Sequence, residues 1–502
     1  MERVLVGVDA GTSNIKTVAF TPNGDELARA DRKNELVGPD GWMEQDMHAT
    51  WELTAATVQE VVASIDDGAE VVAVGVTGQG DGCWLVDGAG EPVRNAILWN
   101  DGRASDIVDE WMEEGVADEL FEICGSGVFP GASLPILRWL DGHEPAALDR
   151  AETVFFCKDW IKYRLTGELT TDLSDASLPF LDVRAREYND ALSELAGVPG
   201  IESLYPRLEE ATTVIGLVTP EASETTGLPE GTPVISGVID IAASAFGSGV
   251  AAPGESSSVV GTTSLNQTLL GSIPDDQTPV GFTLAITDDL YTRAMASMAG
   301  TPNIDWAREH FAGSASFDEI EAAARSVPVG ADGVLYHPYL SSSGERSPFL
   351  KPSARAQFTG IGPSHTRAHL LRAVYEGVAL AMRDCFEHIP SESETVAVSG
   401  GGSRSAFWCQ LFADCLNTEV VVPAGTEFGA RGIALLAGVA LDVYPDIETA
   451  VTETTSIERS YEPRPDHARR YERWHEVYRT TYEAMFDAWD ERAAALREFR
   501  DG

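Results

Sequence analysis

Three glycine-rich turns, widely separated along the chain, have the composition of a phosphate-binding site. They follow short runs rich in β-branched residues, as turns at strand ends do, and lie at residues 9–13, 261–264 and 400–405. Glycine lets backbone N–H groups approach an anion closely, and small hydroxyl side chains add donors. Asp9 could hold Mg²⁺ and Lys16 offers a point charge to phosphate oxygens. A hairpin between core strands would also explain one such turn, but three in order indicate one triphosphate site between two halves of the chain.

Two common nucleotide motifs do not occur in this sequence. No stretch reads G-x-x-x-x-G-K-[ST], and no predicted strand is followed by G-x-G-x-x-G. A P-loop enzyme and a Rossmann dinucleotide site therefore have no support from the sequence.

Two α/β units, residues 1–250 and 251–502, are expected to position the three turns, because 502 residues exceed one ordinary domain. The second unit reopens with the strand–turn–strand pattern of the first. Strands are expected within 26–30, 71–77, 257–270 and 396–398. A helix capped by Ser364 is expected at 364–389, and a second helix is expected to end at Leu416. One long amphipathic helix is expected at 465–498, and its aromatic stripe is typical of core packing.

The charge balance argues against one class of partner. Asp and Glu number 80 against 35 Lys and Arg, which gives a net charge of −45, and only five of the cationic residues are lysine. Such a charge repels nucleic acid. Concentrated salt screens self-repulsion, with a Debye length of about 3 Å at 1 M, so the composition favours the cytosol of a halophile. An acidic mesophilic enzyme is the alternative.

Membrane, secretory and metal-binding signals are weak. No apolar run reaches the ~18 residues of a membrane span, and the N-terminus leads directly into a strand. We therefore expect a cytoplasmic protein with no membrane partner. The six cysteines form no C-x-x-C pair and are expected to be buried thiols. His365 and His369 have no third ligand and are expected on a solvated helix face.

An ordered series of further motifs resembles the FGGY family of carbohydrate kinases over nearly the whole chain. The matching segments are Gly-Trp-Met-Glu-Gln-Asp at 41–46, Leu-Trp-Asn-Asp-Gly-Arg at 98–103, Lys-Asp-Trp at 158–160, Leu-Thr-Gly-Glu at 165–168, Gly-Val-Ile-Asp at 237–240, Gly-Glu-Arg-Ser-Pro at 344–348 and Gly-Gly-Gly-Ser-Arg-Ser at 400–405. Trp160 stands where the family has Tyr.

This resemblance implies an α/β fold of two actin-like (ribonuclease H-like) ATPase domains with an interdomain cleft. It implies ATP-dependent phosphorylation of a hydroxyl on a small sugar or polyol, with Mg²⁺ as cofactor, and leaves open whether two copies form a homodimer. Asp240 takes the place of the general base, and a helix N-cap is its alternative role.

The site residues that the resemblance implies fall into three groups. Those for the sugar are Gln79, Gly80, Asp81, Trp99, Asp101, Arg103 and Asp240. Those for ATP are Gly11, Thr12, Ser13, Lys16, Gly261 and Thr262 around the phosphates and Gly401, Gly402 and Ser405 around the adenosine. Those for Mg²⁺ are Asp9 and Asp240.

The substrate loop departs from the xylulokinase pattern. Xylulokinases have Gly-Gln-Met-His-Gly where this chain has Gly-Gln-Gly-Asp-Gly at 78–82, and their Asp-Asn is Asp240-Ile241 here. The loop is similar to that of erythritol kinases, and Asp-Ile is similar to L-xylulose kinases. Residues 98–103 favour a ketopentose such as xylulose, while Asp81, which can accept two hydroxyl groups, favours a polyol of the erythritol or xylitol type. A solvated turn residue is the alternative role for Asp81.

Two other classes of protein compete with a sugar kinase. An actin-like ATPase would keep the phosphate turns but would not need residues 79–81 or 99–103. A kinase-like binding protein without activity would not need both Asp9 and Asp240, and this chain retains both.

Overall fold

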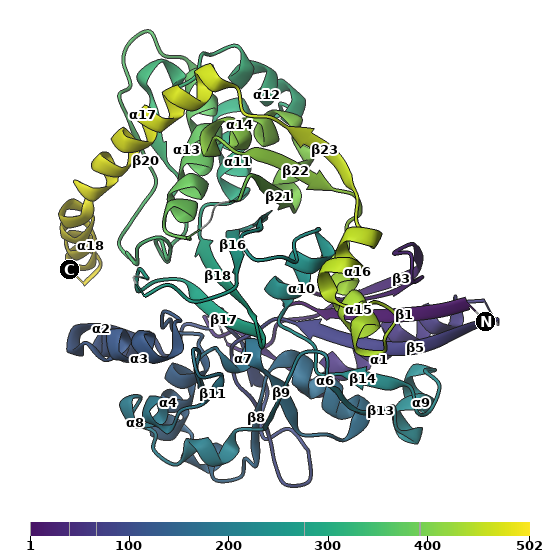
Figure 1. Ribbon diagram of the computed structural model, residues 1–502. Helices are drawn as coiled ribbons and strands as arrows, with labels where there is room; N and C mark the ends of the chain where they lie inside the picture. The colour runs from purple at the N-terminus through teal and green to yellow at the C-terminus, as the bar shows by residue number, and fades with distance from the viewer. Residues whose placement is uncertain (1, 40, 67, 276, 391–392, 502) are drawn as a thin grey trace.

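The computed structural model describes residues 2–39, 41–66, 68–275, 277–390 and 393–501. Two mixed β-sheets, one from each half of the sequence, form its framework (Figure 1). The first sheet has the order β13 (Val214–Leu217), β14 (Pro233–Ile235), β5 (Ala69–Gly78), β1 (Glu2–Ala10), β2 (Asn14–Phe20), β3 (Glu26–Lys33). The second has the order β17 (Phe282–Thr287), β18 (Leu290–Ser297), β16 (Ser264–Leu270), β15 (Ser256–Val260), β21 (Thr395–Ser399), β22 (Glu419–Pro423), β23 (Ile457–Tyr461).

The two sheets share one topology, which confirms the predicted recurrence of the strand–turn–strand pattern. β1 pairs antiparallel with β2 and parallel with β5, just as β15 pairs antiparallel with β16 and parallel with β21. β14 and β22 then extend the two sheets in parallel. The turn after β1 and the turn after β15 therefore occupy equivalent positions, one in each half of the molecule.

Helices lie on both sheets, and some of them lie between the two sheets (Figure 1). Those used below are α6 (Cys157–Thr166), α7 (Leu173–Ala176), α10 (Asp240–Gly247), α12 (Phe317–Arg325), α13 (Arg367–Glu387), α14 (Ala406–Leu416), α15 (Phe428–Ala440), α16 (Ile447–Thr454), α17 (Pro465–Glu483) and α18 (Phe486–Asp501).

The helices α10 and α15 pack closely against each other between the two sheets. A Cβ on Gly432 of α15 would lie 1.8 Å from the Ala243 carbonyl oxygen, so only glycine permits this approach. A Cβ on Gly7 of β1 would likewise lie 1.9 Å from the Ala430 carbonyl oxygen. Although α15 belongs to the second half of the sequence, it lies against β1 and β5 of the first sheet.

Two helix ends differ from the sequence prediction. The helix predicted at 364–389 is α13, and its N-cap is Thr366 rather than Ser364. The Thr366 N–H donates to His369 Nδ1 at 3.1 Å, so His369 closes the first turn of the helix. The single helix predicted at 465–498 is broken after Glu483 into α17 and α18. Phe486 follows the break, and its ring lies tilted against that of Phe349, with ring centroids 5.1 Å apart.

All six cysteines are buried free thiols, as predicted. Within the described ranges, no helix combines the length and apolar character that crossing a bilayer requires.

Candidate active site

A cavity of about 490 Å³ lies between the two halves of the molecule, as expected for an interdomain cleft. Eight of the residues predicted for the site line it: Thr12, Gln79, Gly80, Asp81, Trp99 and Asp240 from the first half, and Gly261 and Thr262 from the second. The fold thus brings the turn after β1, the turn after β15 and the predicted substrate loop to one space, although they are far apart in the sequence.

Asp240 is the first residue of α10, which begins shortly after β14 ends. Three buried side chains fix the intervening backbone: Lys162 Nζ donates to the Ser236 carbonyl (2.8 Å), Thr77 Oγ1 donates to the Val238 carbonyl (2.6 Å), and Ser174 Oγ accepts from the Ile239 N–H (2.9 Å). Because the segment is anchored on both sides, the Asp240 carboxyl group has a defined position at the cavity.

Carboxyl groups gather around this position. Burial raises the pKa of Asp240 well above its usual range, and the charges of Asp9 and Asp175 raise it further. Burial also raises the pKa of Asp81 well above its usual range, with a further contribution from Asp175. The Asp175 carboxyl group therefore acts on both acids of the cavity. Like charges held this close favour a bound cation or a shared proton.

Asp9 stands near the end of β1, on the side of the sheet that α15 covers. Burial raises its pKa to about 6, Lys16 opposes this rise, and Glu427 adds to it. A Cβ on Gly429 of α15 would lie only 2.5 Å from Asp9 Oδ2, so the glycine leaves space beside this oxygen. The charge of Asp9 adds to the raised pKa of Asp240, and a divalent cation would relieve the repulsion between the two carboxylates. These two carboxylates fit Mg²⁺, which binds proteins through one or two carboxylates and water.

A chain of hydrogen bonds joins the first turn to the substrate loop. Trp99 Nε1 donates to Thr12 Oγ1 at 2.9 Å, and Thr12 Oγ1 donates to Gln79 Oε1 at 2.9 Å. Gln79 Nε2 donates to Gln45 Oε1 at 2.8 Å, and Gln45 Nε2 returns to the Thr12 carbonyl at 2.7 Å. Gln45 therefore closes the ring of hydrogen bonds between the first turn and the substrate loop, although the sequence analysis did not assign it to the site. Its place in the 41–46 motif was the available signal.

Asp81 has an unusual backbone and an unpaired oxygen. It adopts φ 57°, a conformation that favours glycine, and only 5% of its surface is exposed. Its Oδ1 has no hydrogen-bond partner among the described residues. A buried acceptor without a partner is costly, so this oxygen is suited to a ligand hydroxyl in the cavity.

Asp101 and Arg103 are not among the residues that line the cavity. Arg103 Nε contacts Asp101 Oδ1 at 2.8 Å, and its guanidinium also reaches Glu44 at 2.7 Å. Its guanidinium carbon lies 4.2 Å from the ring centre of Trp42, and Asp101 Oδ2 accepts from the Met43 N–H at 2.7 Å. Both residues therefore join the segment that follows Trp99 to residues 42–44.

Lys16 and Ser13 are also not among the residues that line the cavity. Lys16 Nζ forms an ion pair with Glu427 Oε2 at 2.8 Å, just before α15 begins. Ser13 is exposed in the turn, and Gly11 donates its N–H to the Asn14 carbonyl at 3.0 Å. The predicted adenosine residues lie in the second half at the start of α14, where the Ser405 hydroxyl caps the helix by accepting from the Trp408 N–H at 3.0 Å. Gly401 and Gly402 form the short 3₁₀ turn before it.

A buried ionic network behind the cavity was missed by the sequence analysis. Lys158 Nζ lies 2.9 Å from Asp159 Oδ1, 2.6 Å from Asp172 Oδ1 and 2.6 Å from Asp175 Oδ2, with all four side chains fully buried. Burial raises the pKa of Asp175 to about 7, although Lys158 opposes the rise. The network connects Lys158 of α6 to Asp175 of α7 and so to Asp81 and Asp240. The Lys-Asp motif at 158–159 was the one sequence signal for it.

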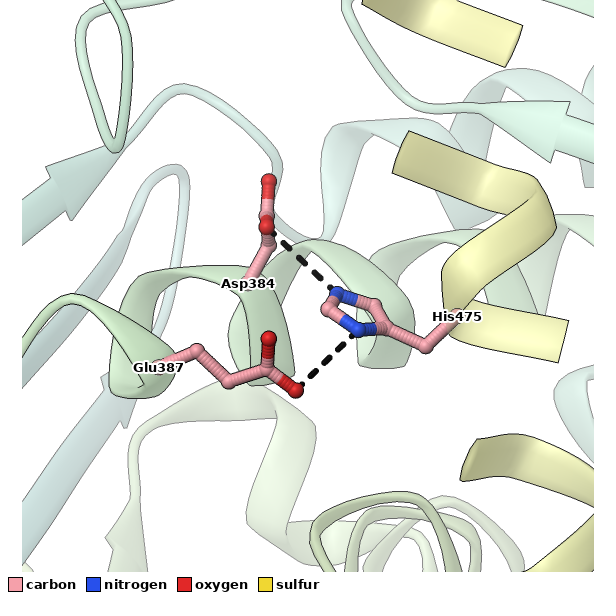
Figure 2. Close-up of side chains that lie close together, drawn as sticks. All are labelled: Asp384, Glu387 and His475. Carbon is pink, nitrogen blue, oxygen red and sulfur yellow. Dashed lines mark ion pairs between the residues drawn. The ribbon is translucent and has the colours of Figure 1, made fainter. Parts of the chain in front are cut away.

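Another group of potential metal ligands lies outside the cleft, on α13 and α17 (Figure 2). His475 Nδ1 lies 3.1 Å from Glu387 Oε1, and Nε2 lies 3.4 Å from Asp384 Oδ1, so each ring nitrogen faces its own carboxylate. Arg479 lies 3.5 Å from both acids. Burial alone would lower the pKa of His475, but the two carboxylates outweigh it and raise the pKa. This arrangement is an ion-paired clamp between two helices.

Family models and individual known proteins are similar to this chain over most of its length. Two family models match the chain, described as the FGGY family of carbohydrate kinases, N-terminal domain, over residues 4–247, and C-terminal domain, over residues 256–441. The chain is 32% identical to an erythritol kinase of Brucella abortus, covering 98% of each protein, and 28% identical to a xylulose kinase of Bacillus subtilis, covering 99% of each.

Solved structures show the same architecture. A xylulose kinase from Rhodospirillum rubrum superposes with a TM-score of 0.88 at 29% identity, covering 97% of this chain and all of that one. A gluconate kinase from Lactobacillus acidophilus superposes with a TM-score of 0.93 at 23% identity, covering 98% of this chain and all of that one, and this likeness concerns the fold alone.

Proposed function

The chain belongs to the FGGY family of carbohydrate kinases, and from that membership we propose that it transfers the γ-phosphoryl group of ATP to a hydroxyl of a ketopentose such as xylulose. One observation carries the proposal. Asp240 and Asp81 line the same cavity as Thr12, Gly261 and Thr262, so a base, a hydroxyl acceptor and two phosphate-binding turns surround one space.

In this proposal Asp240 orients the attacking hydroxyl and accepts its proton while the hydroxyl oxygen bonds to the γ-phosphorus and the bond to ADP breaks. The raised pKa of Asp240 makes its carboxylate a stronger base than an exposed aspartate. Asp9 and Asp240 would hold Mg²⁺, which supplies positive charge to the phosphate oxygens. The backbone N–H of Thr12 and the N–H groups of the turn after β15 would donate to the phosphate chain, as the actin-like topology of the two sheets favours.

The substrate proposal depends on the Gln79–Asp81 loop. A Cβ on Gly80 would lie 2.1 Å from Ile239 Cδ1, so Ile239 fills the space that a larger residue at position 80 would need. Asp81 lines the cavity next to Gly80, and its Oδ1 has no hydrogen-bond partner among the described residues. An acyclic four- or five-carbon chain with adjacent hydroxyls would satisfy this acceptor.

A polyol of the erythritol or xylitol type is the second candidate substrate. It is favoured by the same Asp81 carboxylate, which accepts hydroxyl donors and needs no carbonyl group on the ligand. The 32% identity to an erythritol kinase over the full length supports this alternative.

The decisive experiment measures ADP release with Mg²⁺ and ATP across D- and L-xylulose, ribulose, erythritol, xylitol and glycerol. We expect a ketopentose to give the highest kcat/KM. If erythritol or xylitol gives the highest kcat/KM instead, the substrate is a polyol. A clear preference for glycerol would contradict both substrates. ADP release that no sugar stimulates would instead indicate an actin-like ATPase without sugar chemistry.

We also propose a cytoplasmic, salt-rich setting for the enzyme. The net charge of −45 supports it, because self-repulsion of this size is relieved where salt is concentrated. The salt dependence of unfolding, given below, tests this proposal independently of the substrate.

A further inference from the structure

A second cavity, of about 350 Å³, lies in the second half of the molecule and shares no lining residue with the interdomain cleft. Elements α12, α13, α14 and α17 and the segment after α12 surround it. Its lining residues are Arg325, Val327, Pro328, Val329, Arg372, Phe407, Gln410, Arg464, His467 and Arg470. We call it the arginine pocket.

The charged residues that line the arginine pocket are basic, whereas most charged residues of the chain are acidic. Acidic residues outnumber Lys and Arg by 80 to 35 in the sequence. The pocket lining contains four arginines, one histidine and no acidic residue. In a protein that carries a net charge of −45, a cavity walled by guanidinium groups needs a specific explanation.

Acidic neighbours neutralise only part of this positive charge. The buried Arg372 is paired with Glu376 at 2.6 Å, and Arg464 Nε lies 3.0 Å from Asp414 Oδ2. Arg325 has only a distant acidic contact, with Glu321 at 3.7 Å. Arg470 is exposed and has no ion pair or hydrogen bond with any residue that the structure describes. The guanidinium groups of Arg325 and Arg470 are therefore available to a ligand.

The pocket is also held in shape before any ligand binds. The ring of Phe407 supports two of the guanidinium groups, with Arg325 at 4.8 Å and Arg372 at 5.3 Å from its centre. Helix α17 begins at Pro465, and Arg464 is its N-cap, so the positive end of a 19-residue helix adds to the same field. The contact with Phe407 restrains Arg325, and the planar donors of a guanidinium group match a phosphate group.

We propose that the arginine pocket binds a small phosphorylated metabolite. Arg325 and Arg470 would contact the phosphate oxygens, and the apolar surface of Val327, Pro328 and Phe407 would accept the carbon skeleton. The cavity is within the size range of small-molecule sites. A free carboxylate is a weaker match, because it offers fewer oxygens to two separate guanidinium groups.

The test is isothermal titration of the full-length protein with fructose 1,6-bisphosphate at one fixed salt concentration. The variants are Arg470→Gln and the double variant Arg325→Gln with Arg470→Gln. Arg469→Gln is the matched control, because Arg469 is the exposed neighbour of Arg470 on α17, pairs with Asp466 and does not line the pocket. Any binding of the probe in the interdomain cleft is common to all four proteins, so a failure of the proposed kinase function would not affect the comparison.

We expect wild type and Arg469→Gln to bind the probe equally, Arg470→Gln to raise Kd roughly 5- to 30-fold, and the double variant to lose this binding. Thermal unfolding midpoints should match among the variants, because both side chains are exposed. Undetectable binding by wild type, or an unchanged Kd in the double variant, would overturn the proposal. A second titration with gluconate, which carries a carboxylate and no phosphate, should give much weaker binding, and equal binding would overturn the phosphate assignment.

Discussion

Thr12 Oγ1 donates a hydrogen bond to Gln79 Oε1 at 2.9 Å, and this bond joins the turn after β1 to the loop after β5. Thr12 is proposed to contact the phosphate chain of ATP, and Gln79 is proposed to contact the sugar. The two ligand sites are thus parts of one hydrogen-bonded unit, and a change in one should be felt in the other.

The first prediction concerns this coupling. Gln79→Ala should raise KM for the sugar roughly 5- to 30-fold, because it removes a buried polar partner, and should also raise KM for ATP by freeing Thr12. Thr12→Val should mainly raise KM for ATP, and it should also raise KM for the sugar because Gln79 loses its hydrogen-bond partner. Steady-state kinetics of wild type, the two single variants and the double variant form a double-mutant cycle, which measures the coupling between Thr12 and Gln79. We expect the double variant to lose less than the sum of the single losses, and strict additivity for both substrates would contradict the coupling.

The second prediction concerns the proposed base. Asp240→Asn keeps the shape of the side chain but cannot accept the proton of the hydroxyl, so kcat should fall roughly 10²-fold or more. Binding of ATP, measured by titration, should change little. Asp118→Asn is the matched control, because Asp118 is another acid that lines the cavity and has no proposed role. Wild-type turnover in Asp240→Asn would refute the assignment.

The third prediction concerns recognition of the sugar by Asp81. Its removal leaves substrate hydroxyls without an acceptor in a closed cleft, at a cost of about 1–3 kcal/mol. Asp81→Ala should therefore raise KM for the true substrate roughly 5- to 150-fold, with much less effect on KM for ATP. If every KM stays at the wild-type value, Asp81 is a turn residue only.

The fourth prediction concerns salt. Because the chain carries a net charge of −45, its folded state should be destabilised by self-repulsion in dilute buffer. Thermal unfolding followed from about 0.1 M to 3 M KCl should show a rising midpoint as the Debye length shortens. A midpoint that stays flat or falls over this range would favour an acidic mesophilic enzyme.

The fifth prediction concerns the clamp of His475, Asp384 and Glu387 (Figure 2). The pKa of His475 is raised above 6.5, so its stabilising effect is complete below that pH and is lost as the pH rises through the folded-state pKa. The pKa of Glu387 is lowered from 4.5 to about 2, chiefly by His475, so its effect is complete above pH 4.5 and is lost as the pH falls towards about 2.

The stabilising effect of the clamp should therefore be greatest between about pH 4.5 and 6.5. In that window His475→Gln should lower the unfolding midpoint, on the order of 1–3 °C for a protein of this size, and the deficit should shrink on either side. His143→Gln serves as control, since His143 is exposed and its Nδ1 contacts only the Trp139 carbonyl among the described polar groups. A deficit that does not vary with pH would show that His475 stabilises by packing alone.

The sequence determined those features that depend on short stretches of chain. The turn after β1 and the turn after β15 were predictable, because glycine, β-branched residues and small hydroxyl residues impose local backbone preferences. The order of these segments was enough to indicate two α/β units and a shared cleft. The six buried thiols also followed from spacing and composition.

Tertiary structure decided which side chains meet. Nothing in the sequence pairs Lys16 with Glu427, joins Arg103 to Glu44, or sets Asp175 behind the cavity. Such contacts join residues that are far apart in the chain, and they exist only because two sheets and the α10–α15 pair bring them together. Local preference also gives way to packing at the chain end, where α18 turns away from α17 so that Phe486 reaches Phe349. Pairing between distant side chains depends on the whole packed arrangement, and no window of sequence contains that information.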